Sequence, residues 1–174
     1  AKLAASSTVG GVERLARSDR RHAATADEWD ADIWLLNTPG GIVNLHTGRM
    51  HPHNRHDRMT KTASATPRGS SKIWLNFIAQ VTQGDQKYAD YLQRFAGYCL
   101  TGSTQEHALF FLYGTGANGK SVFVNTLFTL LGDYAANAPI DTFMEARSDR
   151  HPTDLAGLRG ARFVGATETE QGRR

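Results

Sequence analysis

Apolar side chains recur every three or four residues in several stretches of the chain, and this spacing is typical of one face of a helix. We predict one helix within residues 1–24, a pair of helices within residues 70–102, and a further helix that begins near residue 120. Ser70–Ser71 and Asp85 can cap the paired helices, because their side-chain oxygens can accept from the free N–H groups of a first turn. We expect the aromatic residues of this pair to form core and to have no base-stacking role.

Shorter apolar runs bounded by turn residues predict strands. Residues 33–36 and 42–45 flank a turn at Thr38–Gly41, and together they predict a hairpin or a small meander. Residues 108–113 predict a buried strand directly before a glycine-rich turn. A further strand is predicted at residues 161–167.

The composition sets limits on the class of protein. The formal charge is +3, a mild basic excess that is compatible with a nucleic-acid partner. Cys99 is the only cysteine, so no internal disulfide can form; we expect a reducing compartment, the cytoplasm, and a buried structural thiol. No apolar run reaches 18 residues, so we predict no membrane span. A histidine-rich stretch is interpreted as an exposed polar loop rather than a zinc site, and it contains His46, His51, His53 and His56.

The stretch from residue 114 to residue 121 matches the phosphate-loop pattern G-x-x-x-x-G-K-[ST] without a mismatch. Its glycines let backbone N–H groups curl around a phosphate, and the following helix N-terminus adds partial positive charge. Lys120 can reach the β- and γ-phosphates, and the Ser121 hydroxyl can ligate Mg²⁺. We therefore predict ATP and Mg²⁺ as ligands, with the nucleotide held by Gly114, Thr115, Gly116, Ala117, Asn118, Gly119, Lys120, Ser121 and Val122.

Hydrolysis of a bound nucleotide also needs an acidic group near the Mg²⁺ and an oriented water. In open parallel sheets such groups lie at the carboxyl ends of strands, beside the phosphate loop. Glu168 follows the strand predicted at residues 161–167, and Glu170 points the same way if that strand continues. We therefore predict Lys120, Glu168 and Glu170 as catalytic residues, and Ser121 and Glu168 as the groups that hold Mg²⁺.

Several runs of this chain resemble the superfamily 3 helicases of phage and plasmid primase–helicases. The resemblance rests on the phosphate loop and on Leu131–Tyr134, His151–Arg162 and Glu168–Glu170. Upstream, Leu36–Gly41 and Asn44–Gly48 resemble the poxvirus-type primase-associated domain that precedes this helicase. The resemblance covers nearly the whole chain.

The resemblance implies a hexameric, ATP-driven helicase that moves along single-stranded DNA during phage or plasmid replication in the cytoplasm of a host cell. It assigns Gly114–Ser121 to the Walker A motif, and Glu168 and Glu170 to the Walker B motif. The polar sensor residue and the arginine finger of the family would follow beyond Arg174. We therefore expect these 174 residues to bind ATP and to hydrolyse it very slowly or not at all.

The expected fold is α/β in three parts. A small mixed α+β, primase-associated domain covers residues 1–69, a helical segment covers residues 70–102, and a P-loop ATPase core with a parallel sheet covers residues 103–174. Two other functions stay open from the sequence. The chain could be another P-loop enzyme, such as a small-molecule kinase, or a degenerate prophage fragment that binds nucleotide or DNA without turnover.

Overall fold

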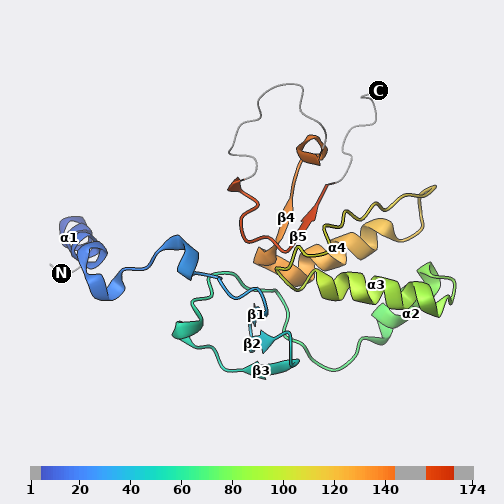
Figure 1. The fold of residues 1–174 in the computed structure, drawn as a ribbon, viewed down its shortest axis with the longest axis horizontal. Helices are drawn as coiled ribbons and strands as arrows, with labels where there is room; N and C mark the ends of the chain where they lie inside the picture. The colour runs from blue at the N-terminus through green and yellow to red at the C-terminus, as the bar shows by residue number, and fades with distance from the viewer. Residues whose placement is uncertain (1–4, 144–155, 167–174) are drawn as a thin grey trace.

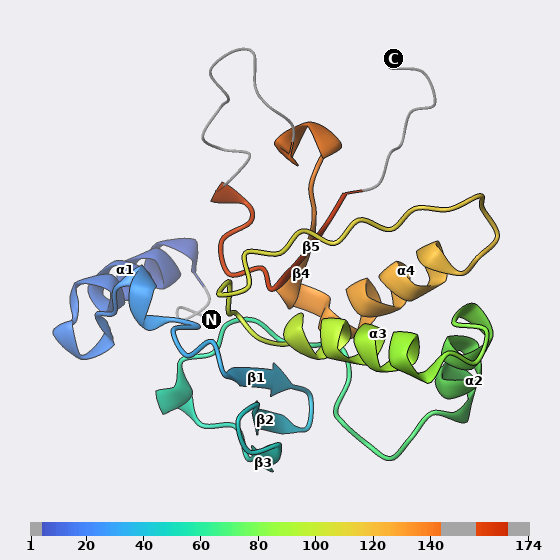
Figure 2. The same ribbon diagram turned by 45° about the vertical axis from the view of Figure 1, so that its right-hand side comes forward.

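The computed structural model describes residues 5–143 and 156–166. Its elements, in chain order, are α1 (Ser6–Ser18), η2 (Arg20–His22), η3 (Ala26–Glu28), β1 (Leu35–Thr38), β2 (Gly41–Asn44), β3 (Arg49–His51), η4 (Arg55–Asp57), α2 (Lys72–Val81), α3 (Gln86–Tyr98), α4 (Lys120–Leu131), η5 (Gly132–Tyr134), β4 (Ala135–Asn137), η6 (Ile140–Phe143) and β5 (Phe163–Gly165). Figures 1 and 2 show the two small sheets on opposite sides of α3, with α1 standing apart at one end. None of the helices within the described ranges combines the length and the hydrophobicity that a membrane crossing requires.

The first sheet is antiparallel in the order β1–β2–β3, and it confirms the predicted hairpin. Leu36 lies opposite Val43 and both side chains are buried. The buried Thr38 hydroxyl donates to the Gly41 carbonyl at 2.7 Å and so closes the turn. The third strand, β3, makes this sheet the small meander that was the other predicted possibility. Its bounds were not predicted, because Arg49–His51 shows no apolar alternation, and pairing with β2 holds it in place.

The predicted helical pair is confirmed as α2 and α3. The Ser71 side chain accepts from the Trp74 N–H at 3.3 Å, and Asp85 caps α3 in the same way. The spacing of apolar residues predicts one helix face that contains Ile73, Trp74, Phe77, Ile78 and Val81. This face is wrong at Ile73, which is 85% exposed. Trp74 of the same predicted face does pack on the core, and its ring stacks on that of Phe123 of α4 at 5.7 Å between centroids.

The helix predicted after the phosphate loop is α4, and it buries Phe123, Leu127 and Leu131. Next to it lies a two-stranded parallel sheet in which Ala135 of β4 pairs with Phe163 of β5. The strand predicted at residues 161–167 is confirmed in its centre, whereas β4 was not predicted. The described residues thus form a mixed α/β structure with small sheets, and the larger parallel sheet expected of a P-loop core is not confirmed.

The buried strand predicted at residues 108–113 is wrong. Phe111 and Tyr113 are 80% and 84% exposed, while Phe110 packs inward with its ring centroid 4.2 Å from that of Phe95. A strand requires a hydrogen-bonded neighbour, and within the described residues the backbone of this stretch has no such partner. The run is therefore an extended segment that enters the phosphate loop without belonging to a sheet.

One hydrophobic core joins the three parts of the chain. It collects buried side chains from the first sheet, from the helical pair and from the region after the phosphate loop, namely Leu36, Val43, Ala63, Phe95, Cys99, Phe123, Leu127, Leu131, Tyr134 and Phe163. The continuity of this core shows that the first sheet packs directly on the later elements. The domain boundaries given above remain a prediction.

A partly buried arginine connects the same parts through polar contacts. Arg162 donates from Nη1 to the Leu100 carbonyl at 2.6 Å and from Nη2 to the Leu35 carbonyl at 2.7 Å. Its guanidinium also lies 4.4 Å from the centre of the Tyr134 ring, whose hydroxyl donates to the Lys61 carbonyl. Burial lowers the pKa of Arg162 and raises that of Tyr134 relative to their ordinary values.

Replacement of Arg162 should destabilise the fold. Arg162→Ala is expected to lower the free energy of unfolding by about 3 kcal/mol, because hydrogen bonds to charged groups are worth about 1.5–3 kcal/mol each. The matched control is Arg159→Ala, whose side chain is mostly exposed and pairs with Asp27 on the surface, so its effect should be far smaller. Urea unfolding followed by circular dichroism measures both, and equal losses would contradict the role given to Arg162.

The thiol of Cys99 should be inert in the folded protein. Burial raises its pKa to about 11, so at about pH 8 roughly a thousandth of it is thiolate. We expect slow labelling by a disulfide reagent in native buffer and complete labelling in urea. In native buffer the labelling rate should rise about tenfold for each unit by which the pH is raised toward that pKa. Rapid labelling of the native protein at neutral pH would show that Cys99 is accessible.

Candidate functional site

The loop that precedes α4 has an unusual backbone conformation. Gly114, Gly116 and Gly119 have φ angles of 150°, 94° and 84°, and Ala117 has a φ of 47°. L-amino acids rarely adopt such angles, which explains why glycines fill most of these positions. Four residues with positive φ between residues 114 and 119 give the tightly curled backbone that a phosphate loop needs.

Two of the glycines are also required by close neighbours. A Cβ atom on Gly114 would lie 2.3 Å from Nδ2 of Asn118, and one on Gly119 would lie 2.5 Å from Cγ1 of Val81. The first contact places the Asn118 side chain over the start of the loop. The second packs the end of the loop on α2, so that the helical pair helps to hold the start of α4.

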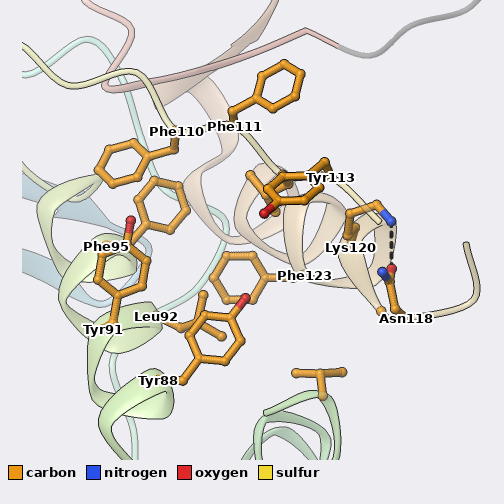
Figure 3. Close-up of a pocket in the computed structure, with 13 residues that line it drawn as sticks. Tyr88, Tyr91, Leu92, Phe95, Phe110, Phe111, Tyr113, Asn118, Lys120 and Phe123 are labelled. Atoms are coloured by element: carbon orange, nitrogen blue, oxygen red, sulfur yellow. Dashed lines mark hydrogen bonds between the residues drawn. The ribbon is translucent and has the colours of Figure 1, made fainter. Parts of the chain in front are cut away.

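Lys120 is anchored inside the loop by its own neighbours. Its Nζ donates to Oδ1 of Asn118 at 2.8 Å and to the Gly114 carbonyl at 3.2 Å, and Figure 3 shows the first of these bonds. Within the described residues, the backbone N–H groups of residues 115–119 make no hydrogen bond. The loop thus presents one cationic amine and a set of unpaired donors, which are the groups that bind phosphate oxygens.

The first turn of α4 adds to this set. Gly119 is the N-cap residue and provides no side-chain acceptor, so the free N–H groups and the positive end of the helix dipole face outward. Ser121 and Val122 are exposed in this first turn. The Ser121 hydroxyl is therefore accessible to a metal ion beside the phosphates, and the residues present fit the phosphates of a Mg-nucleotide.

A pocket of about 420 Å³ opens directly beside the loop. Asn118, Gly119 and Lys120 line it on the loop side. The rest of the wall is mainly aromatic, with side chains from α3, α4 and the extended segment, namely Tyr88, Tyr91, Phe95, Phe110, Phe111, Tyr113 and Phe123. Tyr88 was expected on the buried apolar face of its helix, and this is wrong; Tyr91 was not assigned to that face. These two are 49% and 46% exposed. The sequence did carry a signal for this exposure. Both residues are tyrosines, three positions apart on one helix face, and buried cores favour phenylalanine or leucine over the polar phenol group.

The described residues do not include the predicted acidic partners. Glu168 and Glu170 lie outside them, and β5, the strand that leads toward both, ends at Gly165. The predicted nucleotide-binding residues from Gly114 to Val122 are consecutive and all lie within the described residues, whereas Glu168 and Glu170 do not. The roles of both sets remain predictions.

The histidine-rich stretch makes local contacts with the first sheet. Nε2 of His53 lies 2.8 Å from the Thr38 carbonyl oxygen, and the His46 ring stacks on Trp34 at 4.1 Å between centroids. In the part of the chain that the structure describes, no group of three or more histidine, cysteine, aspartate or glutamate side chains is placed to hold a metal ion.

Comparison with known proteins gives two similarities. Residues 1–83 match a family model described as "D5 N terminal like", which is the N-terminal region of primase–helicases. The chain is also 31% identical over 90 residues to a protein of Acanthamoeba polyphaga mimivirus named "Putative helicase"; the aligned stretch is 51% of this chain and 9% of that protein. The family match ends before the phosphate loop, which therefore rests on its own motif and geometry. Together, the two similarities support a relation of this chain to the phage and viral primase–helicases.

Proposed function

We propose that this chain is the ATP-binding segment of a phage or plasmid primase–helicase that couples ATP hydrolysis to DNA unwinding. The observation that carries the proposal is the loop Gly114–Ser121, which joins a complete phosphate-loop motif to a curled backbone with unpaired N–H groups and a lysine amine. The similarity of residues 1–83 to a primase–helicase region supports the choice of a helicase over other P-loop enzymes.

Binding of the nucleotide requires an exchange of partners inside the loop. Phosphate oxygens would take the places that Asn118 Oδ1 and the Gly114 carbonyl occupy around Lys120 Nζ. The exchange replaces neutral acceptors with charged ones, which strengthens each hydrogen bond. Ser121, with Glu168, would hold the Mg²⁺ that neutralises charge on the β- and γ-phosphates.

The chemical step would depend on the acidic residues. We propose that Glu168 orients the attacking water or holds Mg²⁺ through water, with Glu170 as its neighbour. Lys120 would stabilise the charge that develops on the transferred phosphoryl group.

The partners of the proposed enzyme follow from the same family. We propose single-stranded DNA as the polymer on which it moves and a homo-hexamer as the active assembly. DNA replication of this kind would take place in the cytoplasm of the host cell.

Loss of the loop lysine should weaken nucleotide binding. Lys120→Ala removes charge-assisted contacts worth roughly 1.5–3 kcal/mol, so the affinity for Mg·ATP should fall about tenfold or more. Lys87→Ala is the matched control, since Lys87 is an exposed lysine of α3 that does not line the pocket. Titration of a fluorescent ATP analogue into the three proteins gives the affinities, and equal values for the wild type and Lys120→Ala would refute the site.

Loss of the first glutamate should affect turnover more than binding. The assay uses a longer protein that contains these 174 residues and hydrolyses ATP in the presence of single-stranded DNA. In that protein, Glu168→Gln should reduce turnover about 10²-fold or more and leave nucleotide affinity within a few-fold. Glu106→Gln, at an exposed position before the loop, serves as the control. Normal turnover in Glu168→Gln with loss of turnover in Glu170→Gln would transfer the role to Glu170.

A further inference from the structure

We infer that the aromatic pocket beside the phosphate loop receives the base of the bound nucleotide, and that Tyr88 of α3 stacks on it. The inference rests on the proposed function, because it assumes that the phosphates of the same molecule lie in the loop. It goes further by assigning a role to α3, a helix that no phosphate-loop motif includes.

The position of the pocket supports this assignment. Asn118, Gly119 and Lys120 belong both to the phosphate loop and to the pocket wall. Figure 3 shows Lys120 and Asn118 at one end and Tyr91 of α3 at the other, with Tyr88 and Phe123 between them. A ligand whose anionic tail lies at Lys120 therefore has its remaining part directed into the pocket.

The chemistry of the wall indicates which kind of ligand fits. Of the described residues that line the pocket, Lys120 alone carries a charge, so no carboxylate repels an anion. The remaining wall is mainly aromatic, and its volume of about 420 Å³ suits a small molecule. An aromatic cavity with one cationic end is complementary to a flat ring that carries an anionic tail, and a nucleotide has this composition.

The exposure of the rim supports stacking. Tyr88 and Tyr91 remain about half exposed, although their rings are large and apolar, and the two are stacked at 6.4 Å between centroids. Phe111 and Tyr113 are still more exposed across the opening. Exposed aromatic groups gathered around one concave site indicate a binding surface, and aromatic rings bind bases of any kind by stacking.

The test separates the base from the phosphates. Isothermal titration of the 174-residue chain with ATP and with inorganic tripolyphosphate, both with Mg²⁺, is carried out on the wild type, Tyr88→Ala, Tyr88→Phe and Leu109→Ala. We expect Tyr88→Ala to weaken ATP binding about tenfold, the typical loss of one stacked base, and to leave tripolyphosphate binding unchanged. Tyr88→Phe keeps the ring and should retain the affinity for ATP. Leu109→Ala controls for loss of an exposed apolar side chain from the same region, since Leu109 is 75% exposed and does not line the pocket.

Several results would overturn the inference. If both ligands bind and Tyr88→Ala changes neither affinity, the base lies elsewhere and the phosphate loop keeps its proposed role. If neither ligand binds to the wild type, the proposed function and the inference fail together. If Tyr88→Ala weakens the binding of a single-stranded oligonucleotide and not that of ATP, the pocket serves the DNA strand and the assignment to the nucleotide base is wrong.

Discussion

The partly buried guanidinium of Arg162 joins three distant parts of the chain. It donates to carbonyls at the start of β1 and after α3, and it stacks on Tyr134, whose hydroxyl accepts from the Asn37 N–H of β1. Partial burial of a charge is costly unless its donors are paired, and these pairings can be made only when all the parts are correctly placed. The arginine thereby fixes the relative positions of the first sheet, the helical pair and the parallel sheet.

This arrangement has a direct consequence for the candidate site. Phe163 follows Arg162 in sequence and lies against Phe128 of α4 at 4.9 Å and against Phe95 of α3 at 6.4 Å between ring centroids. The arginine and its neighbour therefore hold α3 beside α4. Because the phosphate loop enters α4 and the tyrosines project from α3, the same packing creates the pocket between them.

The loop before α4 shows how a candidate site can orient its cation through residues of its own. Lys120 satisfies its donors with Asn118 and Gly114 of the same loop, while the curled backbone keeps its N–H groups exposed. A site whose cation is already oriented loses less conformational entropy when an anion replaces the internal acceptors. Asn118 thus has a role that follows from the structure alone: it holds the lysine amine in position inside the loop.

The sequence by itself determined the features that depend on a few neighbouring residues. The caps at Ser71 and Asp85, the hairpin around Thr38 and the glycine-rich turn before α4 were all predicted, because their hydrogen bonds and backbone angles are local. The buried thiol of Cys99 was predicted from its apolar surroundings, and it is buried.

The tertiary structure decided the features that need partners far away in sequence. Residues 108–113 have the composition of a buried strand, but strand formation depends on a neighbouring backbone that no local pattern specifies. The short strand β4 exists because β5 lies beside it, and Tyr88 became part of a pocket wall because α4 packs nearby. Local preference sets which conformations are available to a segment, and long-range packing selects among them, so the loop could be predicted from the sequence whereas the pocket beside it could not.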